Sequence, residues 1–167
     1  MASVFFTADT HFGHSNIIKY CNRPFSNVEE MNRTIIDNLN AVIAPQDTLY
    51  HLGDFSFGPQ TPFREKINCN NIHLIRGNHD KQVDYKLFSS VKDINEYRTP
   101  DTTIIMCHYA MRSWNKKHYN SYHIFGHSHS TLEDFDLSFD CGVDGNNFIP
   151  WSLDEVIIRM QSKINNF

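Results

Sequence analysis

The chain has 167 residues, of which 40% are hydrophobic and 20% are charged, and its formal net charge is -4. This length and composition predict one globular domain over residues 1–167 and exclude a disordered or membrane-spanning chain. The acidic balance argues against strong non-specific binding to nucleic acid, and the start of the chain lacks the features of a signal peptide, so we expect a cytoplasmic protein. Four cysteines without a C-x-x-C pair predict free thiols.

The first half of the chain alternates predicted strands and helices. Buried strands are predicted for the apolar runs at residues 4–8, 48–52 and 72–75. After a polar loop over residues 11–25, a capping-box pattern at residues 26–29 starts a helix, which Pro45 ends. Pro62 begins a short second helix, because proline is tolerated at the first helical position. This alternation predicts a parallel sheet with helical crossovers.

The second half of the chain contains a different pattern. Apolar runs at residues 103–106 and 122–125 predict two further buried strands. From Phe135 to Val143, apolar residues alternate with polar or small ones, which is the period of a strand with one buried face. This alternation indicates a second sheet. A second capping box at residues 152–155 then starts a last helix with a single apolar face.

Each of five strand-like runs ends in residue types that bind metal ions. The segments are Asp9-Thr10-His11, Gly53-Asp54, Gly77-Asn78-His79-Asp80, Cys107-His108 and Gly126-His127-Ser128-His129. In open α/β sheets ligands bind beyond the carboxyl ends of the strands, so these segments are expected to converge. Glycine before Asp54, Asn78 and His127 fits tight turns in which a side chain would crowd the site. The sequence therefore predicts one metal site at the edge of a sheet.

The candidate metal ligands are carboxylate, carboxamide and imidazole groups. They are Asp9, His11, Asp54, Asn78, His108, His127 and His129. Without a thiolate, this set favours manganese, iron, zinc or nickel over calcium or an iron–sulfur cluster, and manganese is the metal expected to support activity in vitro. Two divalent metal ions that share Asp54 as a bridging carboxylate would use all of these ligands. Paired metals are a standard device of phosphoryl chemistry, so hydrolysis of a phosphate ester is the leading hypothesis.

In their order, these motifs resemble those of the calcineurin-like metallophosphoesterases, and residues 12–25 look like a compact bacterial and phage-type branch of that superfamily. The resemblance implies an α/β fold, a four-layer α-β-β-α sandwich of two facing mixed sheets flanked by helices. It places Asp9, His11, Asp54 and His129 on one metal ion. It places Asp54, Asn78, His108 and His127 on the other. It also implies that His79 faces the phosphate, as a general acid for the leaving group or as a stabiliser of charge.

The roles of the other polar residues near the motifs are less specific. Asp80 could orient His79 or a ligand, or it could cap a helix. His14 could reach the substrate phosphate or could hold its own loop by a hydrogen bond. Arg23 is a further candidate for substrate binding. Arg112 belongs to a loop of cations and aromatic residues that could grip a nucleotide or could be an ordinary solvated loop.

The residues after Gly53-Asp54 bear on the substrate. They read Phe55-Ser56-Phe57-Gly58, without the Asp-Arg-Gly continuation of the protein serine/threonine phosphatases, so a phosphate-gripping arginine is missing. A monoester dianion gains more from such an arginine than a diester monoanion, so we expect a small or nucleotide-like phosphodiester as substrate. The alternatives are a phosphomonoesterase, a mononuclear metalloenzyme of another type, and a non-catalytic protein-binding module, as the same fold serves in a retromer subunit.

Overall fold

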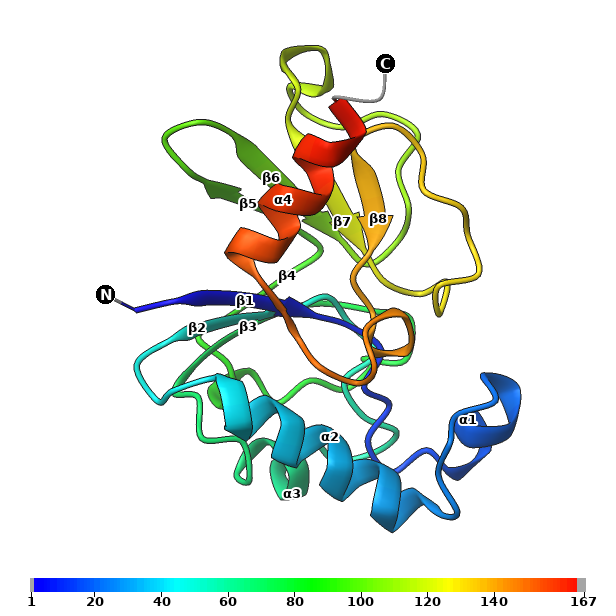
Figure 1. Ribbon diagram of the computed structural model, residues 1–167. Helices are drawn as coiled ribbons and strands as arrows, with labels where there is room; N and C mark the ends of the chain where they lie inside the picture. Colours follow the sequence, from blue (N-terminus) through cyan, green and yellow to red (C-terminus); the bar gives the residue numbers. More distant parts are fainter. Residues whose placement is uncertain (1, 165–167) are drawn as a thin grey trace.

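Two mixed sheets form the centre of the computed structural model, which describes residues 2–164 (Figure 1). The first sheet has the order β4-β3-β2-β1-β9, and only β9 is antiparallel to its neighbour. The second sheet has the order β5-β6-β7-β8, and only β5 is antiparallel to its neighbour. With helices flanking these sheets, the predicted fold class is confirmed.

The strands are short, and most are joined by loops or single helical turns. Their bounds are β1 Val4–Thr7, β2 Thr48–His51, β3 Asn71–Ile75, β4 Ser90–Lys92, β5 Ile94–Arg98, β6 Thr103–Cys107, β7 Tyr122–Phe125, β8 Ser138–Asp140 and β9 Trp151–Ser152. The α-helices are α1 Ser15–Tyr20, α2 Val28–Val42, α3 Thr61–Arg64 and α4 Leu153–Ile164. Single 3₁₀ turns are η1 Tyr85–Leu87, η2 Lys117–Tyr119 and η3 Val143–Gly145. None of the helices within residues 2–164 has the length and hydrophobicity that crossing a membrane requires.

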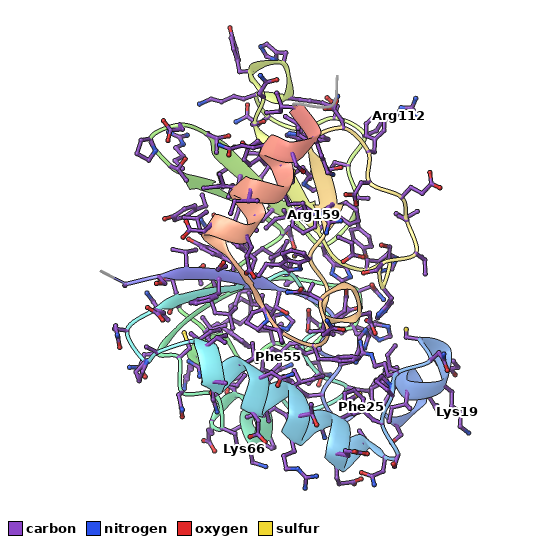
Figure 2. All side chains as sticks on the ribbon, viewed as in Figure 1. Lys19, Phe25, Phe55, Lys66, Arg112 and Arg159 are labelled. Carbon is purple, nitrogen blue, oxygen red and sulfur yellow. The ribbon has the colours of Figure 1, made fainter. Side chains whose placement is uncertain are left out.

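The first hydrophobic core lies between the first sheet and α2. Alternate strand residues such as Leu49 and Ile72 face the helix, which buries Met31 and Ile35 against them. Figure 2 shows Phe55, which belongs to the same core, between the sheet and α2. Helix α2 begins two residues later than the start of the predicted capping box, because the side chain of Asn27 rather than that of Ser26 accepts the free N–H of Glu30.

The second hydrophobic core lies between the two sheets and α4. Phe6 of β1 and Ile104 of β6 face each other across it, and Met160 of α4 adds to it. Helix α4 packs against β9 and β1, and its Arg159 lies over the rings of Phe139 and Trp151 (Figure 2). The capping box of this helix is confirmed, because the Glu155 N–H donates to Ser152 Oγ and the Glu155 carboxylate accepts the Ser152 N–H.

The second sheet begins earlier than the sequence indicated. The predicted strands at 103–106 and 122–125 lie in this sheet, and the alternating run from Phe135 onward contributes only the short strand β8. Buried strands of either sheet are apolar on both faces, so composition cannot assign them to one sheet or the other. The structure also adds α1 within the predicted polar loop, and three strands that sequence periodicity missed: β4, β5 and β9.

Candidate metal centre

The candidate ligands lie beyond the carboxyl ends of strands from both sheets. Asp9 follows β1, Asp54 follows β2 and Asn78 follows β3 in the first sheet. His108 and His127 follow β6 and β7 in the second sheet. The loops are joined by backbone hydrogen bonds, including those from Asp9 N to Gly53 O and from Gly126 N to His108 O, both 3.0 Å. The site is therefore formed where the carboxyl edges of two sheets meet.

Most of the candidate ligands have strained backbone conformations. Positive φ angles occur at Asp9 (58°), His11 (49°), Asp54 (54°), His127 (68°) and His129 (49°). Such conformations are uncommon for residues with a side chain and persist only where the surrounding structure holds them. All five residues lie in the turns that follow the strands, and each contributes a ligand atom to one of two groups.

A first group of ligand atoms comes from Asp9, His11 and His129. One nitrogen or oxygen from each lies within 4.8 Å of the others. His11 Nδ1 lies 3.2 Å from His14 Nδ1, which leaves His11 Nε2 to face the group. His129 Nδ1 is bonded to the Asp144 carboxylate at 2.8 Å, which leaves its Nε2 free to bind a metal ion.

A second group comes from Asp54, His108 and His127, again with one ligand atom of each within 4.8 Å of the others. His108 donates from Nδ1 to the carbonyl oxygen of Leu52 at 2.7 Å, so that Nε2 faces the site. Asn78 Oδ1 lies 3.1 Å from His108 Nε2 and completes this group.

Asp54 lies between the two groups. Its Oδ2 is 3.4 Å from His11 Nε2 in the first group and 3.5 Å from His108 Nε2 in the second. Burial alone would raise the pKa of Asp54, but the neighbouring His108 and His11 and the N–H of His79 outweigh it and lower that pKa. A carboxylate in this position can bridge two cations.

The unpaired polar atoms of the first group fit a bound cation. Asp9 Oδ1 and His11 Nε2 are buried and have no hydrogen-bond partner among residues 2–164, although unpaired buried polar groups are costly. Burial raises the pKa of Asp9 well above its ordinary value, and the carboxylates of Asp140, Asp54 and Asp144 add to the shift. Burial also lowers the pKa of His11 to about 3. A divalent ion would offset the negative charge of the carboxylates and would bind the neutral imidazole of His11.

Arg23 is a buried residue that holds the first group of candidate ligands in position. It forms a two-pronged ion pair with Asp144, with both N–O distances 2.8 Å, and also donates to the backbone oxygens of Asp9 and Thr10 and to Met31 Sδ. Burial alone would raise the pKa of Asp144, but hydrogen bonds from His129 and Arg23 outweigh it and lower that pKa. The Arg23 side chain is completely buried and all five of its N–H groups are used, so the substrate contact expected from the sequence does not fit the structure.

Arg112 does not lie at the metal centre. Figure 2 shows it on the loop after β6 at the far end of the molecule, with its side chain directed outward, and it is exposed. Of the two arginines that the sequence offered for substrate binding, Arg23 is buried and Arg112 is directed outward.

Asp80 joins two of the ligand loops. Its carboxylate accepts the N–H groups of Asp54 (2.7 Å), Phe55 (3.0 Å) and Gly77 (2.8 Å). Burial raises its pKa despite these bonds. Its contacts fit the positioning of Asp54 and do not include the His79 side chain, so of the alternatives considered, the orientation of a ligand is the one that the geometry favours.

His79 and His14 lie at the open side of the first group. The His79 side chain is exposed, and its ring centroid is 5.2 Å from that of His11 and 5.9 Å from that of His14. His14 stacks on Phe57 with ring centroids 4.6 Å apart. Both histidines can therefore reach a molecule bound over the metal ligands.

Close contacts explain two of the glycines in the motifs. A Cβ atom on Gly77 would lie 2.2 Å from Asp54 Oδ1, and one on Gly126 would lie 2.9 Å from Asp9 Oδ2. A side chain at either position would displace a candidate ligand, as the sequence predicted.

The sequence did not single out several residues that support the site. Asp140 is the last residue of β8, and Asp144 lies in η3 just after it. Asp140 accepts the N–H groups of Gly142 and Ser130 and the hydroxyl of Ser128. Cys21 also lies within 4.8 Å of ligand atoms of His129 and Asp144, but those two residues are already bonded to each other. The available signal was the Asp-x-x-x-Asp pair at the end of the alternating apolar run, formed by Asp140 and Asp144.

Comparison with known proteins agrees with this arrangement. The family profile described as "Calcineurin-like phosphoesterase superfamily domain" matches residues 3–138. The chain is 37% identical to the uncharacterized protein MJ1445 of Methanocaldococcus jannaschii over 94% of this chain and 90% of that protein. The chain therefore belongs to the calcineurin-like phosphoesterase superfamily, whose members typically bind divalent metal ions.

Two solved structures are similar to this one. The protein of unknown function AQ665 from Aquifex aeolicus superposes with a TM-score of 0.79 and 25% identity, over 95% of this chain and all of that chain (100%). The phosphoesterase YfcE from E. coli superposes with a TM-score of 0.50 and 19% identity, over 84% of this chain and 78% of its own. At 19% identity, the similarity to YfcE shows a shared fold and no more. Family membership supports hydrolase activity in general terms.

Proposed function

We propose that the protein is a metal-dependent phosphodiesterase that binds two divalent ions and hydrolyses a small or nucleotide-like phosphodiester. The observation that carries the proposal is the position of Asp54 Oδ2, 3.4 Å from His11 Nε2 and 3.5 Å from His108 Nε2, between two groups of candidate ligands. A single carboxylate shared by two such groups is the arrangement that a pair of metals requires.

The proposed mechanism divides the work among the residues of the site. When bound, the two divalent ions would supply a nucleophilic hydroxide and offset the charge of the phosphoryl oxygens. Asp144 and the Leu52 carbonyl accept from Nδ1 of His129 and His108, which leaves Nε2 of each imidazole as the atom that would bind an ion. His79, exposed beside His11, would protonate the leaving oxygen or stabilise its charge, because an imidazole N–H can act as a proton donor or a hydrogen-bond donor.

The positions of the arginines support a diester substrate. Arg23 uses its N–H groups inside the protein, and Arg112 is directed away from the site. A monoester dianion would therefore lack a bidentate guanidinium partner from either residue, whereas the single charge of a diester needs less compensation. Manganese as the supporting metal, and a location in the cytoplasm, stay predictions.

Hydrolysis of bis(p-nitrophenyl) phosphate with added Mn²⁺ tests the proposal. We expect turnover that disappears with a chelator and falls about 100-fold or more in Asn78→Ala, because that variant removes a proposed ligand. A higher rate on p-nitrophenyl phosphate than on the diester would favour a phosphomonoesterase. Inactivity on both esters with manganese, iron, zinc and nickel would contradict the proposal, and failure to bind any of these metals would favour a non-catalytic module.

The role of His79 can be tested with two leaving groups. If His79 is a general acid, His79→Ala should slow the release of a nucleoside alkoxide by about 100-fold or more and the release of p-nitrophenolate much less, because the nitrophenolate needs no proton. An equal loss on both substrates would indicate stabilisation of charge instead. Two bound metals per chain in the variant would exclude a disturbed metal site.

A further inference from the structure

Two large exposed aromatic side chains lie near the candidate metal ligands: Phe57 contacts His14, the neighbour of His11, and Tyr109 contacts His108 and His127. Phe57 is 58% exposed and Tyr109 is 47% exposed. Single exposed aromatic residues are ordinary on protein surfaces, but Phe57 contacts a histidine beside the first ligand group and Tyr109 contacts histidines of the second. Their position is unexplained by the proposed hydrolysis alone.

Phe57 marks the His79 side of the site. Its ring stacks on His14 at an interplanar angle of 16°, and His14 in turn contacts both His11 and His79. Gly58, which directly follows Phe57 in the chain, lines a cavity of about 470 Å³ that also reaches His79 and is large enough for a small-molecule group. The cavity is lined by Gly58, Pro59, Gln60, His79, Lys81 and Gln82.

Tyr109 marks the side of the second ligand group. It directly follows His108, and its ring lies edge-on to His108 and His127, with centroids 5.0 Å and 4.9 Å apart. These contacts occupy only part of the ring, since about half of the residue is accessible. An accessible aromatic face next to a phosphate site can stack on a planar group of the substrate.

A row of contacts separates the two aromatic residues. It runs from Phe57 through His14 and His11 to Asp54, and from there through His108 to Tyr109. Asp54, the proposed bridge, is at the middle of the row. A phosphate bound over Asp54 would therefore have one ester arm directed toward each aromatic residue.

We propose that these two sides are subsites for the two arms of a nucleotide phosphodiester, an inference that rests on the proposed function. Tyr109 stacks on the nucleobase of the arm that stays on phosphorus, and the leaving arm occupies the cavity beside Phe57 and His79. The leaving arm belongs on this side because His79 serves the leaving oxygen. In the reaction a water oxygen bonds to phosphorus, the bond to the leaving oxygen breaks, and that oxygen receives a proton.

Two diesters with the same leaving group test the assignment. Thymidine 5′-(p-nitrophenyl phosphate) and methyl p-nitrophenyl phosphate differ only in the retained arm. We expect kcat/KM to be about 10-fold higher for the thymidine ester, because stacking on a base contributes about that factor. Tyr109→Leu should abolish the preference and Tyr109→Phe should keep it. Phe57→Leu should slow both esters equally, because both place p-nitrophenol in the leaving subsite.

Controls separate this inference from the proposed function. Tyr119→Leu removes an exposed aromatic residue elsewhere and should change neither rate. Equal loss on both esters in Tyr109→Leu would overturn the inference, since Tyr109 would then only pack against the ligands. Equal wild-type rates on both esters would overturn it while leaving the phosphodiesterase intact. Calorimetric binding of thymidine 5′-monophosphate to the manganese-loaded protein, expected to weaken about 10-fold in Tyr109→Leu, decides the inference even if the wild type hydrolyses neither ester.

Discussion

Asp144 connects the two kinds of chemistry in this site, the binding of cations and the internal salt bridges that hold the ligands. It accepts from His129 Nδ1 on one side and pairs with the buried Arg23 on the other. Arg23 in turn donates to the backbone oxygens of Asp9 and Thr10. Two of the three ligands of the first group are thus fixed by one carboxylate and one guanidinium. The orientation of a metal-binding imidazole depends on such partners as much as on the imidazole itself.

Asp144→Asn is expected to weaken one metal site and spare the other. The variant removes the negative charge that orients His129, so affinity at the first site should fall about 10- to 100-fold. Calorimetric titration with Mn²⁺ should then resolve one weakened and one unchanged site. Asp154→Asn, at an exposed position on α4, is the matched control. The assignment of His129 to the first group would be contradicted if the Mn²⁺ affinity fell equally at both sites or was unchanged at both.

At the scale of elements, the turns after the strands decide where the ligands point. The loops after β2 and β3 are joined by the Asp80 carboxylate, which accepts N–H groups from both. The loop after β3 passes so close to Asp54 that only a glycine fits at position 77. The left-handed conformation of Asp54 is held by these contacts, which offset its strain.

Gly77→Ala tests this arrangement. The added Cβ would meet Asp54 Oδ1 at 2.2 Å and Asp54 N at 2.5 Å, so the proposed bridge must move. We expect fewer than two bound metals per chain and a loss of activity of about 100-fold. Gly58→Ala is the comparison: its Cβ meets no atom within 4 Å, but its φ of 98° is strained. That variant should lose about 1 kcal/mol of unfolding free energy and retain both metals. If the Gly77→Ala variant still binds two metal ions per chain, then the metal centre tolerates a displaced Asp54.

At the scale of the whole molecule, two sheets bring residues from distant parts of the chain to one edge, and the interior near that edge is polar. His51 of β2 is 1% exposed, and its Nε2 lies 2.9 Å from Thr10 Oγ1. Its Nδ1 has no hydrogen-bond partner among residues 2–164. Burial lowers the pKa of His51 to about 3, so the folded protein holds this ring neutral. His51 is therefore an interior residue of the first sheet rather than one of the candidate ligands.

The free energy of unfolding should therefore depend on pH through His51. Its pKa is lower in the folded state than in the unfolded chain, so the unfolded chain binds the extra proton, and stability is lost as pH falls below about 6.5. Between about pH 7.5 and pH 5 this residue should account for about 2 kcal/mol. Urea unfolding of metal-free wild type and His51→Gln at both pH values measures it, since other titrating groups are common to both proteins. Equal pH dependence of the two proteins would show that His51 does not contribute.

The sequence by itself determined the strand-like runs and the candidate ligands that follow them, and its resemblance to the family implied the fold class. These features are local: apolar periodicity predicts a strand, and a ligand directly after it stays at the end of that strand. Glycine before a ligand likewise marked a turn that the structure contains. His79 was identified by the order of the motifs rather than by any local pattern.

Only the tertiary structure decided which sheet each later strand joins and what Arg23, Asp80 and Asp144 contact. Arg23 and Asp144 are 121 residues apart in the chain, and neither lies in a segment whose pattern indicates the other. A buried ion pair and an exposed substrate contact require the same residue type, so the sequence could not distinguish them. The fold makes the distinction because it packs Arg23 against the backbone of Asp9, where water and substrate cannot reach its guanidinium.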